Sequence, residues 1–392
     1  MKAPHLVVGV TSAQTCLVFT GWLRSLREAG FRVTLISSPG ELLGRTAAAE
    51  GVDHRAVSMQ RRIAPLSDLV SLFRLWRVLR GLQPDLVEFS TPKAGLLGAL
   101  AARLCGVPVR VYLLRGLKLE SASGLKRRVL LAAERLAAAC VHAVVCNSES
   151  LRAQALDLRI APAAKLHVLG DGSSRGVDAD RFSPGATPVR KQFGILPGAP
   201  VVGFVGRLTR DKGVRELVDA FASILDAAPG AHLLLVGWFD ESEDALDARL
   251  RARILQHPRI HYTGLVSDTA PYYRAMDVLV LPTWREGFPN VVLEAGASGL
   301  PVVTTLATGS RDAVLPEVTG LLIPPGYPEA LRDALLRLLR DPALCRRMGA
   351  AARKWIMEHY AGERVAGLTA AFYQELLLGA SRRRRASGPA GE

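Results

Sequence analysis

The feature that most constrains this chain is an alternation of short β-rich runs with apolar-periodic helical stretches, which occurs twice along its 392 residues. Such alternation predicts parallel sheets whose strands are connected by covering helices. Helices are predicted, for example, over 17–29, 66–80 and 125–139. The predicted strands are 6–10, 33–37, 86–89, 109–114, 141–146 and 166–169 in the first half, and 201–205, 232–236, 260–263, 278–281, 302–304 and 321–323 in the second.

A segment rich in Gly, Ser, Asp and Pro, residues 171–185, separates the two alternating regions and is typical of a linker. We therefore expect a first domain over 1–185 and a second over 186–360. A helix over 361–379 is expected to pack back across the hinge, and a basic tail over 380–392 is expected to be disordered. With two α/β units in tandem, a cleft between them is the expected ligand site.

The composition is that of a folded α/β protein, with 49% hydrophobic and 22% charged residues. No apolar run reaches the roughly 18 residues that a spanning helix needs. The chain is therefore expected in the cytoplasm.

The net charge is +14 and is unevenly distributed, with +11 in residues 1–185 and +3 in the remainder. A basic half favours a polyanionic partner, either an anionic membrane or a phosphorylated substrate. An arginine-rich composition with solvated faces is the alternative. Nucleic acid is disfavoured, because the chain lacks the interleaved aromatic and basic residues of a binding module.

A first candidate site follows the strand predicted over 201–205, where a loop carries Arg207 and Lys212 before a helix expected from about Val214. Parallel sheets bind ligands beyond the carboxyl ends of their strands, where helix N-termini offer free amides to anions. Two cations beside such amides suit a diphosphate. Gly203 and Gly206 do not complete a dinucleotide fingerprint, which disfavours a hydride-transfer enzyme. The alternative is an ordinary loop with two exposed cations.

A second candidate site follows the strand predicted over 278–281, where Glu286 lies in a loop and Glu294 about one turn inside the next helix. We expect Asn290 to be the N-cap of that helix. A carboxylate near an anionic ligand is favourable where it accepts hydrogen bonds from hydroxyls or faces developing positive charge. The two glutamates therefore predict a glycosyl donor site, with helix capping as the alternative role.

Three runs in the second half, GRLTRDKG, EGFPNVVLE and GLPVVTTLATGSRDAV, resemble retaining glycosyltransferase family 4, and so do FSTPKAGLLGALAARLCGVPVRVYLLRG and GSSRGVDADRFSP in the first half. They look closest to bacterial members that build capsule, exopolysaccharide or lipid-linked oligosaccharide. The resemblance implies an α/β GT-B fold, with two Rossmann-like domains whose parallel sheets face a central cleft. It also implies a nucleotide diphosphate sugar donor (UDP ahead of GDP), net retention, no cofactor and no metal.

By motif match, Arg207 and Lys212 are expected to neutralise the diphosphate and, with Glu286, to form the catalytic group. Glu294 is expected to hold the ribose. The donor sugar and phosphates are expected to contact Glu286 and the backbone of the residues that follow it: Gly287, Phe288, Pro289 and Asn290. Gly9, expected in the loop after the first strand, would let the acceptor domain approach the donor.

One position departs from the family pattern. Many relatives carry a histidine after the strand over 109–114, whereas this chain has Arg115. Arginine cannot act as a base at neutral pH, so we expect Arg115 to stabilise the departing phosphate or to bind an acceptor phosphate. Lys93, after the strand over 86–89, is expected to bind the same anionic acceptor. A structural role is the alternative for both residues.

The predicted function is transfer of a hexosyl or N-acetylhexosaminyl group to a glycan or polyprenyl-diphosphate-linked acceptor. The acceptor hydroxyl is expected to attack on the face from which the diphosphate departs, because no clear nucleophilic carboxylate is present for a double displacement. Two alternatives are a sugar-nucleotide epimerase of the same fold and a catalytically silent sugar-nucleotide-binding protein.

We also expect peripheral attachment to the inner face of the plasma membrane through the basic first domain. Trp22, Trp76 and Leu66 are interpreted as helix-core residues, with apolar anchoring as the alternative. The cations expected near the bilayer are Arg61, Arg62, Arg74, Arg77, Lys126, Arg127 and Arg128.

Overall fold

The computed structural model describes residues 3–60, 64–241 and 243–386, which form two compact units, each built on one sheet. The first contains the described residues up to Arg175 and those from Gly362 onward, and the second spans Gly176–Ala361. This division comes earlier than the expected boundary after residue 185. Val177 and Phe182 are buried in the second core, and the amide of Val177 donates to the carbonyl of Tyr360 (2.8 Å).

The first sheet has the strand order β3-β2-β1-β4-β5-β6-β7, and every pairing in it is parallel. In register, Val8 of β1 lies opposite Leu35 of β2 and Glu88 of β4. The edge strand β3 was not predicted, because its four residues are exposed and polar or small. The strands are β1 His5–Gly9, β2 Arg32–Ser37, β3 Asp53–Ala56, β4 Leu86–Ser90, β5 Val109–Leu114, β6 Ala143–Cys146 and β7 Leu166–His167.

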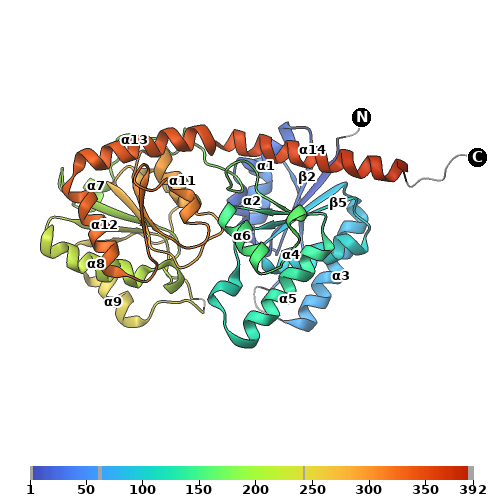
Figure 1. The fold of residues 1–392 in the computed structure, drawn as a ribbon, viewed down its shortest axis with the longest axis horizontal. Helices are drawn as coiled ribbons and strands as arrows, with labels where there is room; N and C mark the ends of the chain where they lie inside the picture. The colour runs from blue at the N-terminus through green and yellow to red at the C-terminus, as the bar shows by residue number, and fades with distance from the viewer. Residues whose placement is uncertain (1–2, 61–63, 242, 387–392) are drawn as a thin grey trace, which may run out of the picture. The chain divides into compact units, whose positions relative to one another are not determined.

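Helices cover both faces of the first sheet (Figure 1). The helices α1 and α14 pack together, while α4 packs between α3 and α5. The helix predicted over 17–29 is interrupted, since Gly21 adopts a φ of 80° between η1 and α1. The helices are η1 Ala13–Phe19, α1 Trp22–Glu28, α2 Glu41–Glu50, α3 Pro65–Leu82, α4 Pro92–Leu104, η2 Lys118–Ser121, α5 Gly124–Cys140, α6 Glu149–Asp157, η3 Ala163–Lys165 and α14 Gly362–Ala386.

The last helix, α14, is part of the core of the first unit. Ala366, Ala370 and Tyr373 are buried there, and the Tyr373 hydroxyl donates to the buried carboxylate of Glu88 in β4. The expectation of a helix ending at residue 379 and a disordered tail from residue 380 is wrong up to Ala386. Ala380 is buried, and alanine and arginine both favour helix. Residues 387–392 of the expected tail lie outside the described residues.

The second sheet has the strand order β10-β9-β8-β11-β12-β13, again with parallel pairing. Leu279 of β11 lies opposite Gly203 of β8 and Val302 of β12. These strands were all predicted, because most of their residues are apolar or β-branched. They are β8 Val201–Val205, β9 His232–Val236, β10 Ile260–Tyr262, β11 Val278–Leu281, β12 Val302–Thr305 and β13 Gly320–Ile323.

The helices of the second unit lie on both faces of its sheet; α8 packs against α12, and α11 against α13. Among the helices of the described residues, none is both long and apolar enough to cross a bilayer. The helices of this unit are α7 Val189–Gln192, η4 Arg210–Lys212, α8 Val214–Ala227, α9 Ala248–Gln256, α10 Ala270–Tyr273, α11 Asn290–Ala297, η5 Arg311–Ala313, α12 Pro328–Arg340 and α13 Pro342–His359.

Each sheet has a point at its centre where the direction of strand addition reverses, between β1 and β4 in the first unit and between β8 and β11 in the second. The loops that follow these strands diverge to opposite faces and leave a crevice at the carboxyl edge of an open parallel sheet, where ligands bind. The fold thus positions the loops after β8 and β11 for ligand binding in the second unit.

Candidate functional site

The residues predicted to bind the diphosphate lie in the loops after β8 and β11, at the switch point of the second sheet. Backbone atoms of these loops approach closely at two glycines. A Cβ at Gly213 (φ 70°) would lie 2.0 Å from the carbonyl oxygen of Pro282. At Gly237 (φ 145°), after β9, it would lie 1.8 Å from the carbonyl oxygen of Gly206. Because only glycine fits such positions, these two residues allow the three loops to pack together.

Lys212 and Glu286, predicted as a phosphate ligand and a sugar ligand, form an ion pair in which Lys212 Nζ donates to Glu286 Oε1. Lys212 ends η4, and Glu286 lies in the loop after β11, where its amide donates to the carbonyl of Thr308 (3.1 Å). Their side chains are 16% and 17% exposed, so each retains some solvent-accessible surface. The structure therefore brings these two predicted residues together.

Arg207, the other predicted phosphate ligand, is also held by carboxylates. Its guanidinium donates to Asp240 Oδ2 (2.9 Å) and lies 3.7 Å from Asp211 Oδ2. Asp240 follows β9, the strand next to β8, so its loop emerges at the same edge of the sheet. The side chain of Arg207 remains 34% exposed. It is thus an accessible cation with a fixed orientation.

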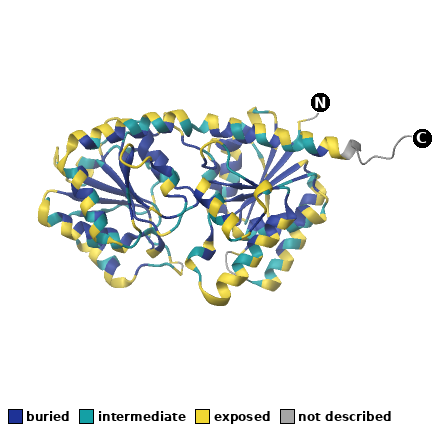
Figure 2. Ribbon diagram, viewed as in Figure 1, coloured by how far each residue is buried: buried dark blue, intermediate teal, exposed yellow. Residues whose placement is uncertain are grey.

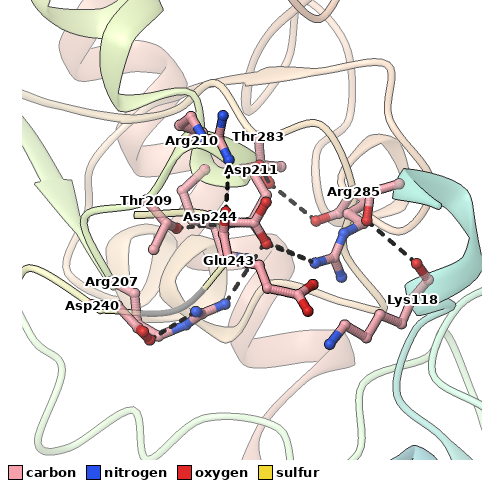
Figure 3. A network of polar contacts seen from close by, with 12 residues as sticks. Lys118, Arg207, Thr209, Arg210, Asp211, Asp240, Glu243, Asp244, Thr283 and Arg285 are labelled. Carbon is pink, nitrogen blue, oxygen red and sulfur yellow. Dashed lines mark hydrogen bonds and ion pairs between the residues drawn. The ribbon is translucent and has the colours of Figure 1, made fainter. Parts of the chain in front are cut away.

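Asp211 connects the two site loops (Figure 3). Its carboxylate accepts hydrogen bonds from Thr209 Oγ1 (2.6 Å) and from Arg285 (3.0 Å), while its carbonyl accepts from the amide of Trp284 (2.9 Å). Burial opposes ionisation, yet the Thr209 hydrogen bond and the charges of Lys212, Arg285 and Arg207 hold the pKa of Asp211 below its ordinary value. Asp211 is therefore an ionised, buried link between the cations of the site.

Sequence reasoning did not assign roles to Asp211, Asp240 or Arg285. A signal was present, since acidic residues follow β9 over 240–244 and Arg285 directly precedes Glu286. These three residues contact one another's partners: Asp240 and Asp211 hold the Arg207 guanidinium, and Arg285 holds Asp211. Arg285 extends the network further, because its guanidinium also lies 3.9 Å from Asp244.

Glu294, predicted to bind a ribose, lies on α11 and is 9% exposed. Its Oε2 accepts a hydrogen bond from the hydroxyl of Tyr273 in α10 (2.9 Å). Burial and the tyrosine contact together fix the orientation of this carboxylate. Glu294 is on the helix that begins directly after the Glu286 loop, but its tyrosine contact is separate from the Arg207–Asp211 network.

The backbone predicted to contact the donor, Gly287 to Asn290, leads into the first turn of α11. The expectation that Asn290 is the N-cap is wrong, because Pro289 occupies that position with extended backbone and Asn290 is the first helical residue. A proline at the N-cap supplies no side-chain acceptor. The Phe288 side chain is buried against Tyr360, with ring centroids 5.3 Å apart, so it anchors the loop in the core.

Arg115, the predicted acceptor ligand, lies just after β5 in the first unit. It donates to Ser90 Oγ (3.1 Å) and Ser174 Oγ (2.8 Å), and its guanidinium lies 5.3 Å from the ring centroid of Phe19. Burial lowers the pKa of Arg115 to about 10, which the nearby Glu88 carboxylate opposes. Arg115 therefore remains a cation at neutral pH, as expected. Burial also raises the pKa of Glu88, whose proximity sequence reasoning missed.

Lys93, the second predicted acceptor ligand, lies in the first turn of α4. Its Nζ contacts Asp68 Oδ1 of α3 (2.6 Å), so the lysine connects two helix starts. Lys93 and Arg115 both lie at the carboxyl edge of the first sheet, and each has its own protein partners.

Gly9 was expected in the loop after the first strand, and that placement is wrong. It is the last residue of β1, and a Cβ there would lie 2.2 Å from the ring of Phe89. The glycine is thus required by packing inside the sheet.

The arrangement in the second unit can bind an anion. Arg207, Lys212 and Arg285 are partly exposed cations, and each is paired with a carboxylate. Among the described residues, no group of three His, Cys, Asp or Glu side chains is placed to hold a metal ion. A ligand with two negative charges could therefore exchange with protein carboxylates at this edge of the sheet.

Family models match both units. A model described as "Glycosyl transferase 4-like domain" matches residues 18–172, and one described as "Glycosyl transferases group 1" matches residues 199–341. In fold, the chain is similar to the sucrose-phosphate synthase of Thermosynechococcus elongatus, with a TM-score of 0.80 and 23% identity over 96% of this chain and 100% of that one.

Three curated relatives are similar over most of the chain. "Capsular polysaccharide biosynthesis glycosyltransferase CapM" of Staphylococcus aureus is 32% identical over 93% of this chain and 95% of its own. A "GDP-mannose-dependent alpha-mannosyltransferase" of Mycobacterium tuberculosis is 34% identical, with 85% and 87% covered. The "UDP-Gal:alpha-D-GlcNAc-diphosphoundecaprenol alpha-1,3-galactosyltransferase" of Escherichia coli is 29% identical, with 72% and 74% covered.

Proposed function

The chain belongs to family 4 of the glycosyltransferases and has the GT-B fold, and on this premise we propose that it transfers a hexosyl or N-acetylhexosaminyl group from a nucleotide diphosphate sugar. The acceptor is a glycan or a polyprenyl-diphosphate-linked sugar in cell-surface glycan synthesis. The names of the relatives in S. aureus and E. coli support that acceptor class. The sugar-nucleotide epimerase and the silent binding protein are not favoured by these relatives.

The observation that carries the proposal is the position of Arg207 and Lys212 at the switch point, each paired with a carboxylate. A bound diphosphate would replace Asp240 at Arg207 and Glu286 at Lys212. The cations would then neutralise the charge that develops on the leaving diphosphate, and no metal is needed for that role. Once the diphosphate has replaced Glu286 at Lys212, the Glu286 carboxylate would be able to accept hydrogen bonds from the donor sugar.

The remaining donor contacts in this proposal follow from α11. Glu294, oriented by Tyr273, accepts from the ribose hydroxyls. The backbone from Gly287 to Asn290 offers amides to the donor at the helix N-terminus. The transfer proceeds with retention, the acceptor hydroxyl attacking on the face from which the diphosphate leaves.

We propose that the first unit binds the acceptor through its cations. Arg115 is held by two serine hydroxyls and retains its charge at neutral pH, which suits an acceptor phosphate. Lys93 lies at the same edge of this sheet. In this proposal the enzyme acts in the cytoplasm. It binds peripherally to an anionic membrane surface through the first unit, because residues 1–185 carry most of the positive net charge.

A donor screen tests the enzymatic proposal. Thermal shift with UDP, GDP and the corresponding nucleotide sugars identifies the base of the donor. Both nucleotides are tested because the relatives include enzymes named for each, and we expect the base to be uracil. Product analysis with bacterial lipid extract as acceptor then identifies the transferred sugar, and the anomeric configuration reports retention.

In a matched comparison, Arg207→Met is expected to weaken diphosphate binding, while Arg253→Met is not, since Arg253 is a comparably exposed arginine paired with Asp219. Equal diphosphate affinities of the two variants would refute the site.

A further inference from the structure

The outward face of α3 is apolar where a surface helix is ordinarily polar. Leu66, Leu69, Val70 and Phe73, spaced at i, i+3, i+4 and i+7, are 50% to 83% exposed. The interpretation of Leu66 as a helix-core residue is therefore wrong. The core is served by a different stripe of the same helix, which includes Leu75 and Leu79. The helix thus has an inner apolar face and a second, outer one.

The carboxyl half of α3 is basic on its exposed surface. Arg74, Arg77 and Arg80 are exposed there, and Arg80 lies 5.2 Å from the ring centroid of Trp76, which stacks on Phe73 (5.7 Å). The one acidic residue of the helix, Asp68, is paired with Lys93. The two aromatic rings therefore connect the apolar end of the helix to its arginine-rich end.

The start of α5 repeats this combination. Leu125 and Val129 are exposed beside Lys126, Arg127 and Arg128, and Glu134, the one acidic residue of α5, is buried. Each of the helices α3, α4 and α5 follows a parallel strand, so all three begin at the carboxyl edge of the sheet. Since α4 packs against both others, the first turns of α3 and α5 lie on one face (Figures 1 and 2).

We propose that this surface, formed by the outer face of α3 and the first turns of α5, is where the chain inserts into an anionic lipid bilayer. The inference deepens the proposed peripheral association and rests on it. Leu66, Leu69, Val70 and Phe73 enter the interfacial region, while the arginines and the lysine of the two helices contact lipid phosphates. Arg61 and Arg62, expected near the bilayer, lie outside the described residues.

Charge complementarity favours a bilayer over a second copy of this chain as the occupant. An identical copy would present the same cations to this surface, and like charges across an interface are unfavourable. An anionic bilayer offers negative charge next to an apolar interior, which matches an apolar stripe bordered by arginines. The starts of α3 and α4 are connected by Asp68 and Lys93, so attachment would bring the bilayer close to the edge of the sheet that carries the proposed acceptor ligands.

The test is co-sedimentation of the full chain with vesicles of phosphatidylcholine alone or mixed equally with phosphatidylglycerol. We expect Leu66→Ser/Phe73→Ser to weaken binding to the mixed vesicles at least tenfold. Arg74→Gln/Arg77→Gln should weaken it about fivefold per cation at low salt. The matched controls, Leu196→Ser/Leu255→Ser and Arg346→Gln/Arg347→Gln, replace similarly exposed residues of the second unit and should bind as the parent protein does.

The outcomes separate the two proposals. If the parent protein binds neither vesicle, peripheral association itself fails. If it binds the mixed vesicles and the α3 variants bind equally well, association stands and the insertion surface is refuted. A change of oligomeric state in Leu66→Ser/Phe73→Ser, measured by sedimentation velocity, without weaker vesicle binding would instead identify this face as a contact between copies. Nucleotide thermal shift, which should be unchanged in every variant, verifies folding.

Discussion

Replacing Glu294 by alanine or glutamine is the most direct test of the proposed ribose site. The side chain is 9% exposed and already accepts a hydrogen bond from Tyr273 (2.9 Å), so its orientation costs little when the ligand binds. A hydrogen bond from a ribose hydroxyl to the carboxylate contributes about 1.5–3 kcal/mol. The Ala variant should therefore bind UDP about 10- to 150-fold more weakly, since 1.4 kcal/mol corresponds to a factor of ten. Glutamine keeps an acceptor without the charge and should lose less.

Isothermal titration calorimetry with UDP measures these affinities, and two further variants make the result specific. Tyr273→Phe removes the hydroxyl that orients the Glu294 carboxylate and should weaken UDP binding less than Glu294→Ala does, because the carboxylate itself remains. Glu286→Ala should lower turnover with less effect on the bare nucleotide, because Glu286 is proposed to contact the sugar. Unchanged UDP and GDP affinities in Glu294→Ala would show that the ribose is bound elsewhere.

Three further outcomes follow from the network, from the cations of the site and from the core of the first unit. Asp211→Asn should lower the free energy of unfolding by about 2–3 kcal/mol at pH 7 in urea titrations. The pKa of Asp211 is lowered in the folded state, so the stability that its carboxylate contributes is present above the unfolded pKa and is lost as pH falls through the folded pKa. The unfolding free energies of the parent and of Asp211→Asn should therefore converge in acid. A difference that stays constant with pH would contradict this. Chelation of divalent metal should leave most transferase activity intact, whereas abolition by chelator and recovery with magnesium or manganese would exclude the metal-free role of Arg207 and Lys212. Burial raises the pKa of Glu134, which accepts from Tyr112 (2.8 Å), to about 7, so the stability it contributes below the unfolded pKa is lost as pH rises through 7. Glu134→Gln should match the parent at about pH 4, below the ordinary glutamate pKa of 4.5, and exceed it by up to about 3 kcal/mol at pH 8, and urea unfolding at both pH values tests this.

The fold was predictable from sequence where burial and periodicity agree. The strand over 109–114 has the same bounds in the structure, as do those over 201–205 and 278–281, because apolar residues predominate in each and a loop residue follows it. The edge strand β3 was not predictable in this way, since its residues are exposed and its order comes from pairing with β2.

The positions of the candidate residues were predictable from the sequence, and their contacts less so. Arg207, Lys212 and Glu286 lie at one edge of the second sheet as expected, because they follow the ends of neighbouring parallel strands. Their carboxylate partners depend on side-chain directions in three separate loops, which spacing along the chain does not determine. The exposure of Leu66 was missed for a related reason, since α3 has apolar residues on two faces and periodicity alone does not identify the inner one.

The first unit is discontinuous in sequence, and this has a consequence for biosynthesis. The chain leaves that unit after Arg175 and returns at Gly362, so a ribosome completes the entire second unit before it makes α14. Until then the nascent first unit lacks Tyr373, whose hydroxyl contacts Glu88, and a buried face of its core has no cover. The second unit is continuous and has all its strands once Ala361 has emerged. The later-synthesised unit can therefore finish folding before the earlier one, whose core is complete only after α14 has been made.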